Sequence, residues 1–240
     1  MQKHIVSFSG GKDSTAMLIH MLELGMPIDE IVFADTNLEF PEMYVYIQKV
    51  EKFIGRKITV LKEGNWDKWF YGESIRGKTK GQMRGFPLAG SLPCWHSREA
   101  KLHPLDKFCK GHIRYIGYAL NERNNKRRKR ITEYRSGKRE KDYIYPLVDW
   151  RCTERDCFIY LKERDLYNPL YNRFARTGCY LCPKQGKKGL FVLFKHYPNL
   201  WKRLLKYVKD APNNFNHRDN PIILDTLFKK KTNLGERHGK

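Results

Sequence analysis

The stretch Ser9-Gly10-Gly11-Lys12-Asp13-Ser14 lies between two apolar segments, residues 5–8 and residues 15–24. β-Branched and aromatic residues before paired glycines predict a strand and a tight turn, and the longer apolar segment after them predicts a buried helix. Glycines let backbone N–H groups approach a phosphate, while the helix N-terminus and Lys12 supply positive charge. The stretch therefore predicts a polyphosphate-binding turn after a strand.

Strand-like and helix-like patterns alternate beyond this turn. We expect further strands over residues 30–35, 57–61 and 112–119, and helices over residues 41–53 and 97–110. This alternation predicts an α/β fold, a doubly wound and mostly parallel sheet with helices on both faces. We expect a nucleotide-binding domain over residues 1–150. A smaller, basic, helical region containing cysteines is expected over residues 151–240, with Thr153 capping its first helix.

Two segments of the first domain lack apolar periodicity. Residues 72–93 are basic and rich in glycine, which predicts a mobile loop over the site. Residues 121–142 are polar, with five consecutive basic residues from Lys126 to Arg130, and are expected to form an exposed basic arm.

The composition is strongly basic. Lys and Arg number 47 against 26 Asp and Glu, which gives a formal charge of +21 and a pI of about 9.7. Because no acidic residue lies between Leu166 and Lys209, the charge is clustered. We expect a polyanionic partner, first of all RNA or DNA. No apolar segment approaches the ~20 residues of a membrane span, so we expect a soluble cytoplasmic protein whose six cysteines are thiols or metal ligands.

The turn is not a Walker phosphate loop, which would need Ser or Thr after its lysine and a glycine five residues before Gly11. This excludes the P-loop kinases and GTPases. An acid beside bound phosphate, as at Asp13, is repelled unless it caps backbone donors or helps to hold a divalent cation, which suggests Mg²⁺. Asp35 ends the second strand and is expected to point into the ligand crevice, although a role as a helix or turn cap is the alternative.

Here the sequence resembles a known family. The stretch 9–14 is similar to the Ser-Gly-Gly-x-Asp-Ser signature of PP-loop ATP pyrophosphatases, and later segments resemble their phosphoadenosine phosphosulfate (PAPS) reductase branch. Those segments are Asp35–Glu42, Cys94 with Lys101 and Pro104, residues 116–123 ending in Glu122-Arg123, Tyr145–Leu147 with Trp150, Asn168–Tyr171 and Gly178–Pro183. The resemblance covers about residues 4–185.

The resemblance implies an adenine nucleotide, ATP or PAPS, bound with Mg²⁺. Its phosphates would lie on the loop and its adenosine across the second strand, in contact with Ser7, Ser9, Gly10, Gly11, Lys12, Asp13, Ser14, Asp35, Thr36 and Glu39. ATP-using members adenylate an acceptor and release pyrophosphate. In this scheme Lys12 stabilises the leaving pyrophosphate and Asp13 with Asp35 positions Mg²⁺. Lys101 and Arg123 hold the acceptor or the α-phosphate.

Three cysteines are candidate metal ligands. Cys179 and Cys182 stand in a turn closed by Pro183, so both sulfurs can face one metal, and Cys94 is the best third candidate. Family members with an iron–sulfur cluster have adjacent cysteines where this chain has Cys94-Trp95, and no fourth ligand is evident. An iron–sulfur cluster, a zinc site and three metal-free thiols stay open. Cys109, Cys152 and Cys157 are expected to be small buried side chains.

Three functions follow from these motifs. The first is an enzyme that adenylates an acceptor and transfers sulfur to a nucleic acid through a cysteine-bound metal, with a sulfur-donor protein as a further partner. The second is a sulfonucleotide reductase, although its nucleophilic cysteine belongs to a Glu-Cys-Gly-Leu-His tail and no cysteine follows Cys182 here. The third is a nucleic-acid-binding subunit with a non-catalytic pocket, in which aromatic residues stack on bases. Those residues are Tyr180, Phe191, Phe194, Tyr197 and Trp201.

Overall fold

The computed structural model describes residues 1–75, 79–87, 94–138, 142–216 and 218–237, and the side chains of the last helix as far as residue 231. The chain divides into two compact units. Unit 1 comprises residues 1–35, 39–63 and 100–177, and unit 2 comprises residues 36–38, 64–99 and 178–240. Part of the segment 72–93, expected as a loop over the site, lies outside the described residues.

Unit 1 contains a five-stranded parallel sheet. Its strands are β1 (His4–Phe8), β2 (Glu30–Ala34), β3 (Thr59–Leu61), β4 (Ile113–Ile116) and β5 (Tyr143–Ile144), in the order β3-β2-β1-β4-β5. The central β1 pairs with β2 on one side and β4 on the other, so the strand order reverses between β1 and β4. The doubly wound α/β fold predicted from the sequence is confirmed.

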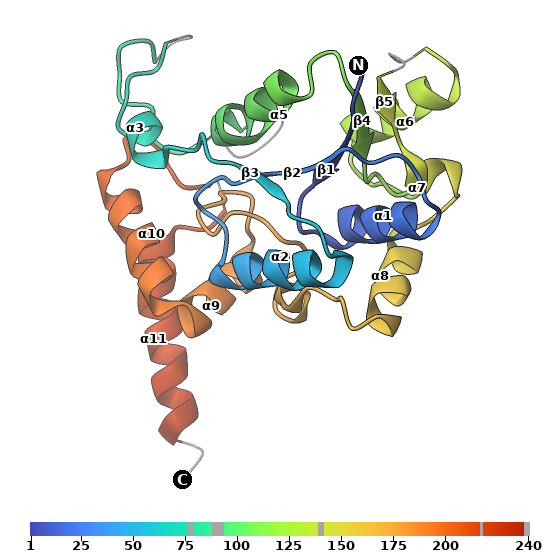
Figure 1. The fold of residues 1–240 in the computed structure, drawn as a ribbon. Coiled ribbons are helices and arrows are strands. Elements are labelled where there is room, and N and C mark those ends of the chain that lie inside the picture. The colour runs from blue at the N-terminus through green and yellow to red at the C-terminus, as the bar shows by residue number, and fades with distance from the viewer. Residues whose placement is uncertain (76–78, 88–93, 139–141, 217, 238–240) are drawn as a thin grey trace. The chain divides into compact units, whose positions relative to one another are not determined.

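Helices cover both faces of this sheet. α1 (Lys12–Glu23) and α2 (Pro41–Ile54) lie on one face and α5 (His103–Phe108) on the other (Figure 1). α7 (Pro146–Asp149) and α8 (Glu154–Glu163) pack against α1, and α8 begins with the predicted capping box at Thr153. On the α5 face, Ile5, Val32 and Ala34 of the strands pack against Leu105 and Cys109.

The basic segment contains a helix, α6 (Asn125–Arg135), where an exposed arm was expected. Asn124 caps it by accepting hydrogen bonds from the backbone N–H groups of Lys126 and Arg127. Ile131 is buried and packs with Tyr145 and Val148. Charged residues with good helix propensity form this helix, and Ile131 is its one fully buried side chain, with Tyr134 packed beside it, which is why it has no apolar periodicity.

The helix predicted over residues 97–110 is interrupted. α4 (Trp95–Ser97) is followed by a π-helical turn, Arg98–Leu102, and then by α5. Pro104, near the start of α5, has no backbone N–H to donate to the preceding turn, so a regular α-helical ladder cannot run through it.

Unit 2 is helical and aromatic. Its other helices are α3 (Trp66–Phe70), α9 (Lys187–His196), α10 (Pro198–Asp210) and α11 (Pro221–Arg237), which confirms the predicted helical tail. Trp66 stacks on Trp95 at 5.1 Å between ring centroids. Of the five aromatic residues proposed to stack on bases, three are buried and two are half-buried, so the buried three cannot form that surface. Tyr180, Tyr197 and Trp201 are 2%, 8% and 3% exposed, and Phe191 and Phe194 pack on Phe228.

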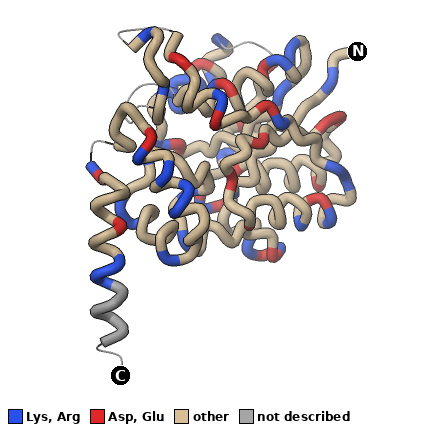
Figure 2. The backbone as a smooth tube through the Cα atoms, turned by 90° about the vertical axis from the view of Figure 1, so that its left-hand side faces the viewer, with Lys and Arg blue, Asp and Glu red and all other residues tan. Residues whose placement is uncertain are grey.

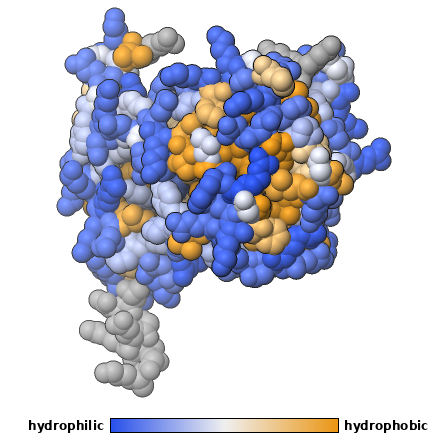
Figure 3. Space-filling model, viewed as in Figure 1, coloured by the Kyte–Doolittle hydropathy of each residue, from blue (hydrophilic) through white to orange (hydrophobic). Residues whose placement is uncertain are grey.

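The surface is mostly hydrophilic. Apolar residues gather in the middle of the face drawn in Figure 3 and are enclosed by hydrophilic ones. Lys and Arg positions are spread along the whole path of the backbone and outnumber Asp and Glu (Figure 2). None of the helices in the described ranges has the length and apolar character needed to cross a membrane.

Candidate functional site

The predicted phosphate loop lies at the carboxyl end of β1, where the strand order reverses. Gly10 has a φ of 69°, in the left-handed region that favours glycine, and a Cβ there would overlap Sδ of Met43. Gly11 is the N-cap of α1. Open α/β sheets bind ligands outside the carboxyl ends of their strands at such a reversal. The loop therefore occupies the position at which this fold binds ligands.

Gly117 brings the end of β4 directly against the loop. A Cβ on Gly117 would lie 2.8 Å from Cα and 2.9 Å from the backbone nitrogen of Ser14, a separation that real Cβ atoms essentially never show. A side chain at residue 117 would therefore push β4 and the start of α1 apart. Glycine at this position lets the two strand ends form one edge of the site.

The two serines of the loop bond to one another and to the loop backbone. The Oγ atoms of Ser9 and Ser14 are 2.9 Å apart, and Ser14 Oγ accepts from the Ser9 N–H at 3.1 Å. Ser14 Oγ also lies 3.1 Å from the carbonyl oxygen of Gly11, to which Thr15 donates at 2.9 Å. These bonds give the loop a defined shape without a ligand.

A segment far along the chain completes the loop. The fully buried Asn168 donates to the carbonyl oxygen of Gly10 at 2.8 Å, and Tyr171 Oη accepts from the backbone N–H of Lys12 at 3.1 Å. Burial raises the pKa of Tyr171, so its hydroxyl stays neutral. The Tyr171 hydroxyl therefore accepts from a backbone N–H at the start of α1 that has no partner within the helix. N–H groups of this kind can bind a phosphate oxygen.

The Lys12 ammonium is held by carboxylates. It lies 2.7 Å from Glu154 Oε2 and 3.3 Å from Asp13 Oδ1. Burial alone would lower the pKa of Lys12, but the hydrogen bond to Glu154 and the charge of Asp13 outweigh it, and the pKa is raised. Lys12 is therefore positively charged, and its charge is balanced within the site.

Asp13 has the properties of a magnesium ligand. Burial, opposed by Lys12 and reinforced by Glu154 and Glu122, raises its pKa. Its Oδ1 is buried, and the Lys12 ammonium lies 3.3 Å from it. Mg²⁺ is usually bound through one or two carboxylates together with substrate phosphates, and the Asp13 carboxylate beside the loop fits that chemistry.

Other predicted nucleotide contacts lie close to this edge. Asp35, at the end of β2, is 1% exposed and accepts from the Tyr44 hydroxyl at 2.9 Å. The buried Glu39 forms an ion pair of 3.8 Å with Lys101, so the structure brings two predicted site residues together. Ser7 Oγ accepts from Arg114 Nε at 2.7 Å.

Arg127 has a clearer link to the loop than the predicted Arg123. It donates to Glu122 at 2.8 Å, and its guanidinium lies 5.1 Å from the centroid of the Tyr118 ring. Burial opposes its charge, but Glu122, Tyr118 and Asp13 together raise the pKa of Arg127. Arg123 is exposed.

The three candidate metal ligands all belong to unit 2. Cys94 Sγ accepts from the Ser97 N–H at 3.4 Å, and its pKa is raised by burial and further by the neighbouring Cys182. Cys179 Sγ lies 3.5 Å from Oγ1 of Thr36, a residue predicted to contact the nucleotide. Cys182 therefore contributes to the raised pKa of Cys94, while the Cys179 thiol contacts Thr36.

These cysteines do not form a metal-ligand set in this arrangement. In the described ranges, no group of three His, Cys, Asp or Glu side chains is placed to hold a metal ion. A tetrahedral or cluster site needs several sulfurs directed at one point. Cys109 and Cys157 are buried, as expected for small apolar side chains, and Cys152 is half-buried.

Sequence reasoning missed three residues of the site. Glu154 was noted only as part of a capped helix, and Arg127 only as part of a charge cluster. Tyr171 belonged to a recognised motif, Asn168–Tyr171, without a role. That motif was the available signal for Tyr171, whereas nothing local to Glu154 or Arg127 indicates contact with a loop more than 100 residues away.

Comparison with known proteins agrees with this geometry. Residues 3–185 match the phosphoadenosine phosphosulfate reductase domain. The chain belongs to the phosphoadenosine phosphosulfate reductase family. The family assignment made from the motifs is confirmed.

Individual relatives span a wide range of similarity. The chain is 32% identical to the uncharacterized protein MJ0973 of Methanocaldococcus jannaschii, over 85% of this chain. It is 21% identical to phosphoadenosine 5'-phosphosulfate reductase of Alkalilimnicola ehrlichii, over 70% of this chain and 65% of that protein. It covers only 47% of MJ0973 and 42% of MJ0066, another protein of M. jannaschii, so it spans less than half the length of these relatives.

Among solved structures, U34-tRNA thiolase NcsA from Methanococcus maripaludis, with its [4Fe-4S] cluster, aligns with a TM-score of 0.44 and 14% identity. The alignment covers 87% of this chain and 71% of that chain.

Proposed function

We propose that this chain is a cytoplasmic, ATP-dependent enzyme that adenylates an acceptor and releases pyrophosphate. We further propose that the acceptor is a nucleic acid, RNA or DNA, to which sulfur is then delivered. The observation that carries the proposal is Lys12, whose backbone N–H and ammonium group both lie where α1 begins beside Gly117. Polyphosphate is the ligand that matches this set of donors.

In this scheme the nucleotide replaces Tyr171 and Glu154 as the partners of Lys12. Phosphate oxygens replace Tyr171 as the acceptor of the Lys12 backbone N–H, and they replace Glu154 as the partner of the Lys12 ammonium. Asp13 Oδ1 binds Mg²⁺ together with those oxygens. When the bond between the α- and β-phosphates breaks, charge grows on pyrophosphate, and Lys12 with the loop N–H groups stabilises it.

The cysteines of unit 2 are the groups we assign to sulfur handling. Cys94 and Cys182 are near enough for the charge of one to affect the ionisation of the other, and burial keeps the Cys94 thiol protonated to a higher pH. A sulfur-donor protein would load them. Cys94, Cys179 and Cys182 do not converge as metal ligands in the described residues, so we assign the sulfur to the thiols themselves.

Metal content tests that assignment directly. Protein purified without oxygen is analysed for iron and zinc, alongside Cys94→Ser, Cys179→Ser and Cys182→Ser. Brown, iron-containing wild-type protein that loses its iron in each variant would establish a cluster on these cysteines. Colourless, metal-free and active protein would rule the cluster out and leave the thiols as sulfur carriers.

The excess of basic residues supports a nucleic-acid acceptor. A charge of +21 exceeds what one nucleotide needs, and α6 concentrates five consecutive basic residues next to Glu122, which borders the phosphate loop.

Pyrophosphate release tests the proposed function. ATP with Mg²⁺ is incubated with the protein, with and without cellular RNA or DNA, and pyrophosphate is measured. We expect release that depends on nucleic acid and is lost in Lys12→Ala. Release unaffected by nucleic acid would contradict the acceptor assignment, and normal ATP binding by Lys12→Ala would contradict the assignment of the loop.

A sulfonucleotide reductase is the second candidate. The family to which the chain belongs and the Alkalilimnicola ehrlichii relative favour it. The same phosphate loop would then hold PAPS or its analogue without the 3'-phosphate, and a cysteine would attack the sulfate sulfur. Sulfite formed from either compound in the presence of a thiol reductant, without pyrophosphate release from ATP, would favour this reductase.

A further inference from the structure

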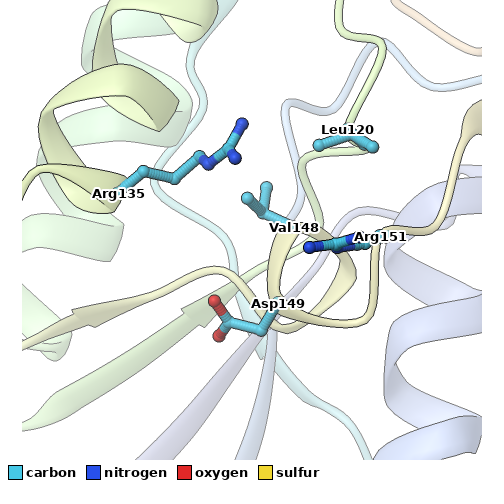
Figure 4. Close-up of a pocket in the computed structure, with 5 residues that line it drawn as sticks. All are labelled: Leu120, Arg135, Val148, Asp149 and Arg151. Atoms are coloured by element: carbon cyan, nitrogen blue, oxygen red, sulfur yellow. The ribbon is translucent and has the colours of Figure 1, made fainter.

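A cavity in unit 1, which we call the arginine cavity, carries two positively charged side chains. It has a volume of about 510 Å³ and is lined by Leu120, Arg135, Val148, Asp149 and Arg151. Arg135 extends from the last turn of α6 and Arg151 from the segment after α7, and both point into the same space (Figure 4). Leu120 and Val148 supply an apolar wall.

The two arginines of the cavity have no side-chain partner among the described residues. In the part of the chain that the structure describes, neither guanidinium makes an ion pair or a side-chain hydrogen bond, whereas Arg114, Arg127 and Arg164 each bind a carboxylate. Asp149 accepts a hydrogen bond from the Tyr134 hydroxyl at 2.8 Å. Burial and then this hydrogen bond raise the pKa of Tyr134 to about 12, so Tyr134 remains a donor to Asp149.

The backbone at Arg151 is strained. Its φ is 58°, in the left-handed region, and it directly follows α7. Its N–H bonds to the carbonyl of Val148 at 3.1 Å, and the next N–H, of Cys152, reaches back to Leu147 at 2.8 Å. This is the helix-ending arrangement in which glycine is preferred. An arginine here is unfavourable for the backbone, and it places a guanidinium in the cavity.

The arginine cavity is close to the phosphate loop along two chain segments. The Leu120 N–H donates to Cys152 at 2.8 Å, and the Glu154 N–H donates to Asn121 at 2.9 Å. Glu154 itself binds Lys12. Glu154 follows Arg151 by three positions, a backbone span of at most roughly 11 Å. A chain of nucleotides held at the cavity can therefore also reach the loop.

We propose that Arg135 and Arg151 bind a phosphate group of the acceptor nucleic acid, with Leu120 and Val148 against the adjoining sugar or base. Guanidinium groups match phosphate oxygens in geometry and charge. The other exposed basic residues of α6 extend this surface along the nucleic-acid backbone. The inference rests on the proposed function in one respect, the choice of a nucleic acid as acceptor.

The test measures binding without ATP. Fluorescence anisotropy of a labelled RNA oligonucleotide is recorded over a range of salt concentrations for the wild type, Arg151→Gly, Arg135→Ala and Lys52→Ala. Lys52 is an exposed lysine of α2 and serves as the matched loss of one charge. We expect each arginine variant to lower affinity about 5- to 10-fold and to reduce the salt slope by about 1. We expect Lys52→Ala to change affinity less than twofold.

Arg151→Gly separates binding from folding. Glycine relieves the left-handed backbone, so the melting temperature should stay the same or rise while RNA affinity falls. The proposal would be overturned if Arg151→Gly bound RNA as tightly as Lys52→Ala does. It would also be overturned if the wild type bound no RNA. A loss of ATP affinity with RNA binding intact would also overturn it, because the cavity would then bind a free nucleotide. RNA binding that depends on Arg151, in a protein that releases no pyrophosphate, would overturn only the proposed function.

Discussion

The phosphate loop and the arginine cavity both carry positive charge in unit 1, but they use it differently. Lys12 lies 2.7 Å from Glu154 and 3.3 Å from Asp13, so its charge is balanced by the protein. Arg135 and Arg151 form no ion pair in the described ranges and sit over an apolar wall. The loop is therefore built to exchange one anion for another. The cavity instead offers two guanidinium groups beside Asp149, whose carboxylate accepts from Tyr134.

This difference matters for selectivity. A ligand of the loop must compete with Glu154 and Tyr171, and it succeeds only if it offers several phosphate oxygens and brings a cation for Asp13. A ligand of the cavity needs negative charge in reach of the two guanidinium groups and a fit beside the carboxylate of Asp149. Variants of the two regions should therefore affect ATP and nucleic acid separately.

The largest expected effect follows from Lys12→Ala. Removing a preorganised cation from the site of developing charge typically costs about 100- to 1,000-fold in rate, and we expect that loss in pyrophosphate release. RNA affinity measured without ATP should stay within twofold of the wild type, because the arginine cavity is intact. Lys49→Ala, which removes an exposed lysine paired with Asp165, serves as the control and should leave both values unchanged.

Gly117→Ala should come next. The new Cβ would meet the backbone of Ser14, so β4 and the loop must separate. We expect a loss of about 1–3 kcal/mol in the free energy of unfolding, typical of overpacking, and about tenfold weaker ATP binding. Gly178→Ala, where a Cβ meets nothing within 4 Å, is the matched control. Calorimetry measures the free energy of unfolding, and nucleotide titration measures ATP affinity. An unchanged ATP affinity in Gly117→Ala would show that the contact with β4 does not shape the loop.

The pH dependence should distinguish the two regions. The pKa of Asp13 is raised above its ordinary value of 3.8, so Asp13 becomes protonated, and Mg²⁺–ATP binding is lost, at a higher pH than for an ordinary aspartate. We expect affinity to fall as the pH is lowered through this raised pKa. Asp13→Asn should bind weakly at every pH with a flat profile. RNA binding by the wild type should show no such loss, because arginine keeps its charge.

The smallest effect is expected from Glu154→Gln, and it has the opposite sign. Losing this carboxylate charge frees the Lys12 ammonium for phosphate, so ATP affinity should rise about three- to fivefold, the size expected for a partly exposed ion pair. Glu163→Gln, on the same helix and not bonded to Lys12, should leave ATP affinity unchanged. Weaker ATP binding by Glu154→Gln would mean that Glu154 orients Lys12 for the nucleotide instead of competing with it.

Much of unit 1 follows from local sequence. The alternation of apolar segments predicted the central strands and the helices α1 and α2, and the glycines with Lys12 predicted the phosphate loop. These features depend on residues next to one another in the chain. The spacing of apolar residues and the residue types in the turns therefore predict them. The sequence did not predict the helix α6 because only Ile131 and Tyr134 of this charged segment pack inward, so the apolar period that predicts helices is absent.

The remainder of the site depends on contacts that the linear sequence does not express. Glu154 reaches Lys12 because α8 packs on α1, and Tyr171 reaches the same residue from a later turn. In the sequence Arg151 is one of many basic residues. Its left-handed backbone, directly after α7, is apparent only in the structure. The aromatic residues of unit 2 were compatible with both a base-stacking surface and a core, and only their burial decides between the two.

The hydrogen bond from Asn168 to the carbonyl of Gly10 joins residues 158 positions apart, and it has a consequence for the order in which the protein forms. A ribosome adds about 5–20 residues per second, so the loop waits roughly 10–30 s for the residue that fixes Gly10. Until then the early strands can pair while the nucleotide site has no final shape. A nascent chain stalled before Asn168 should therefore hold structure without retaining ATP, and nucleotide binding would first arise when the segment 168–171 docks.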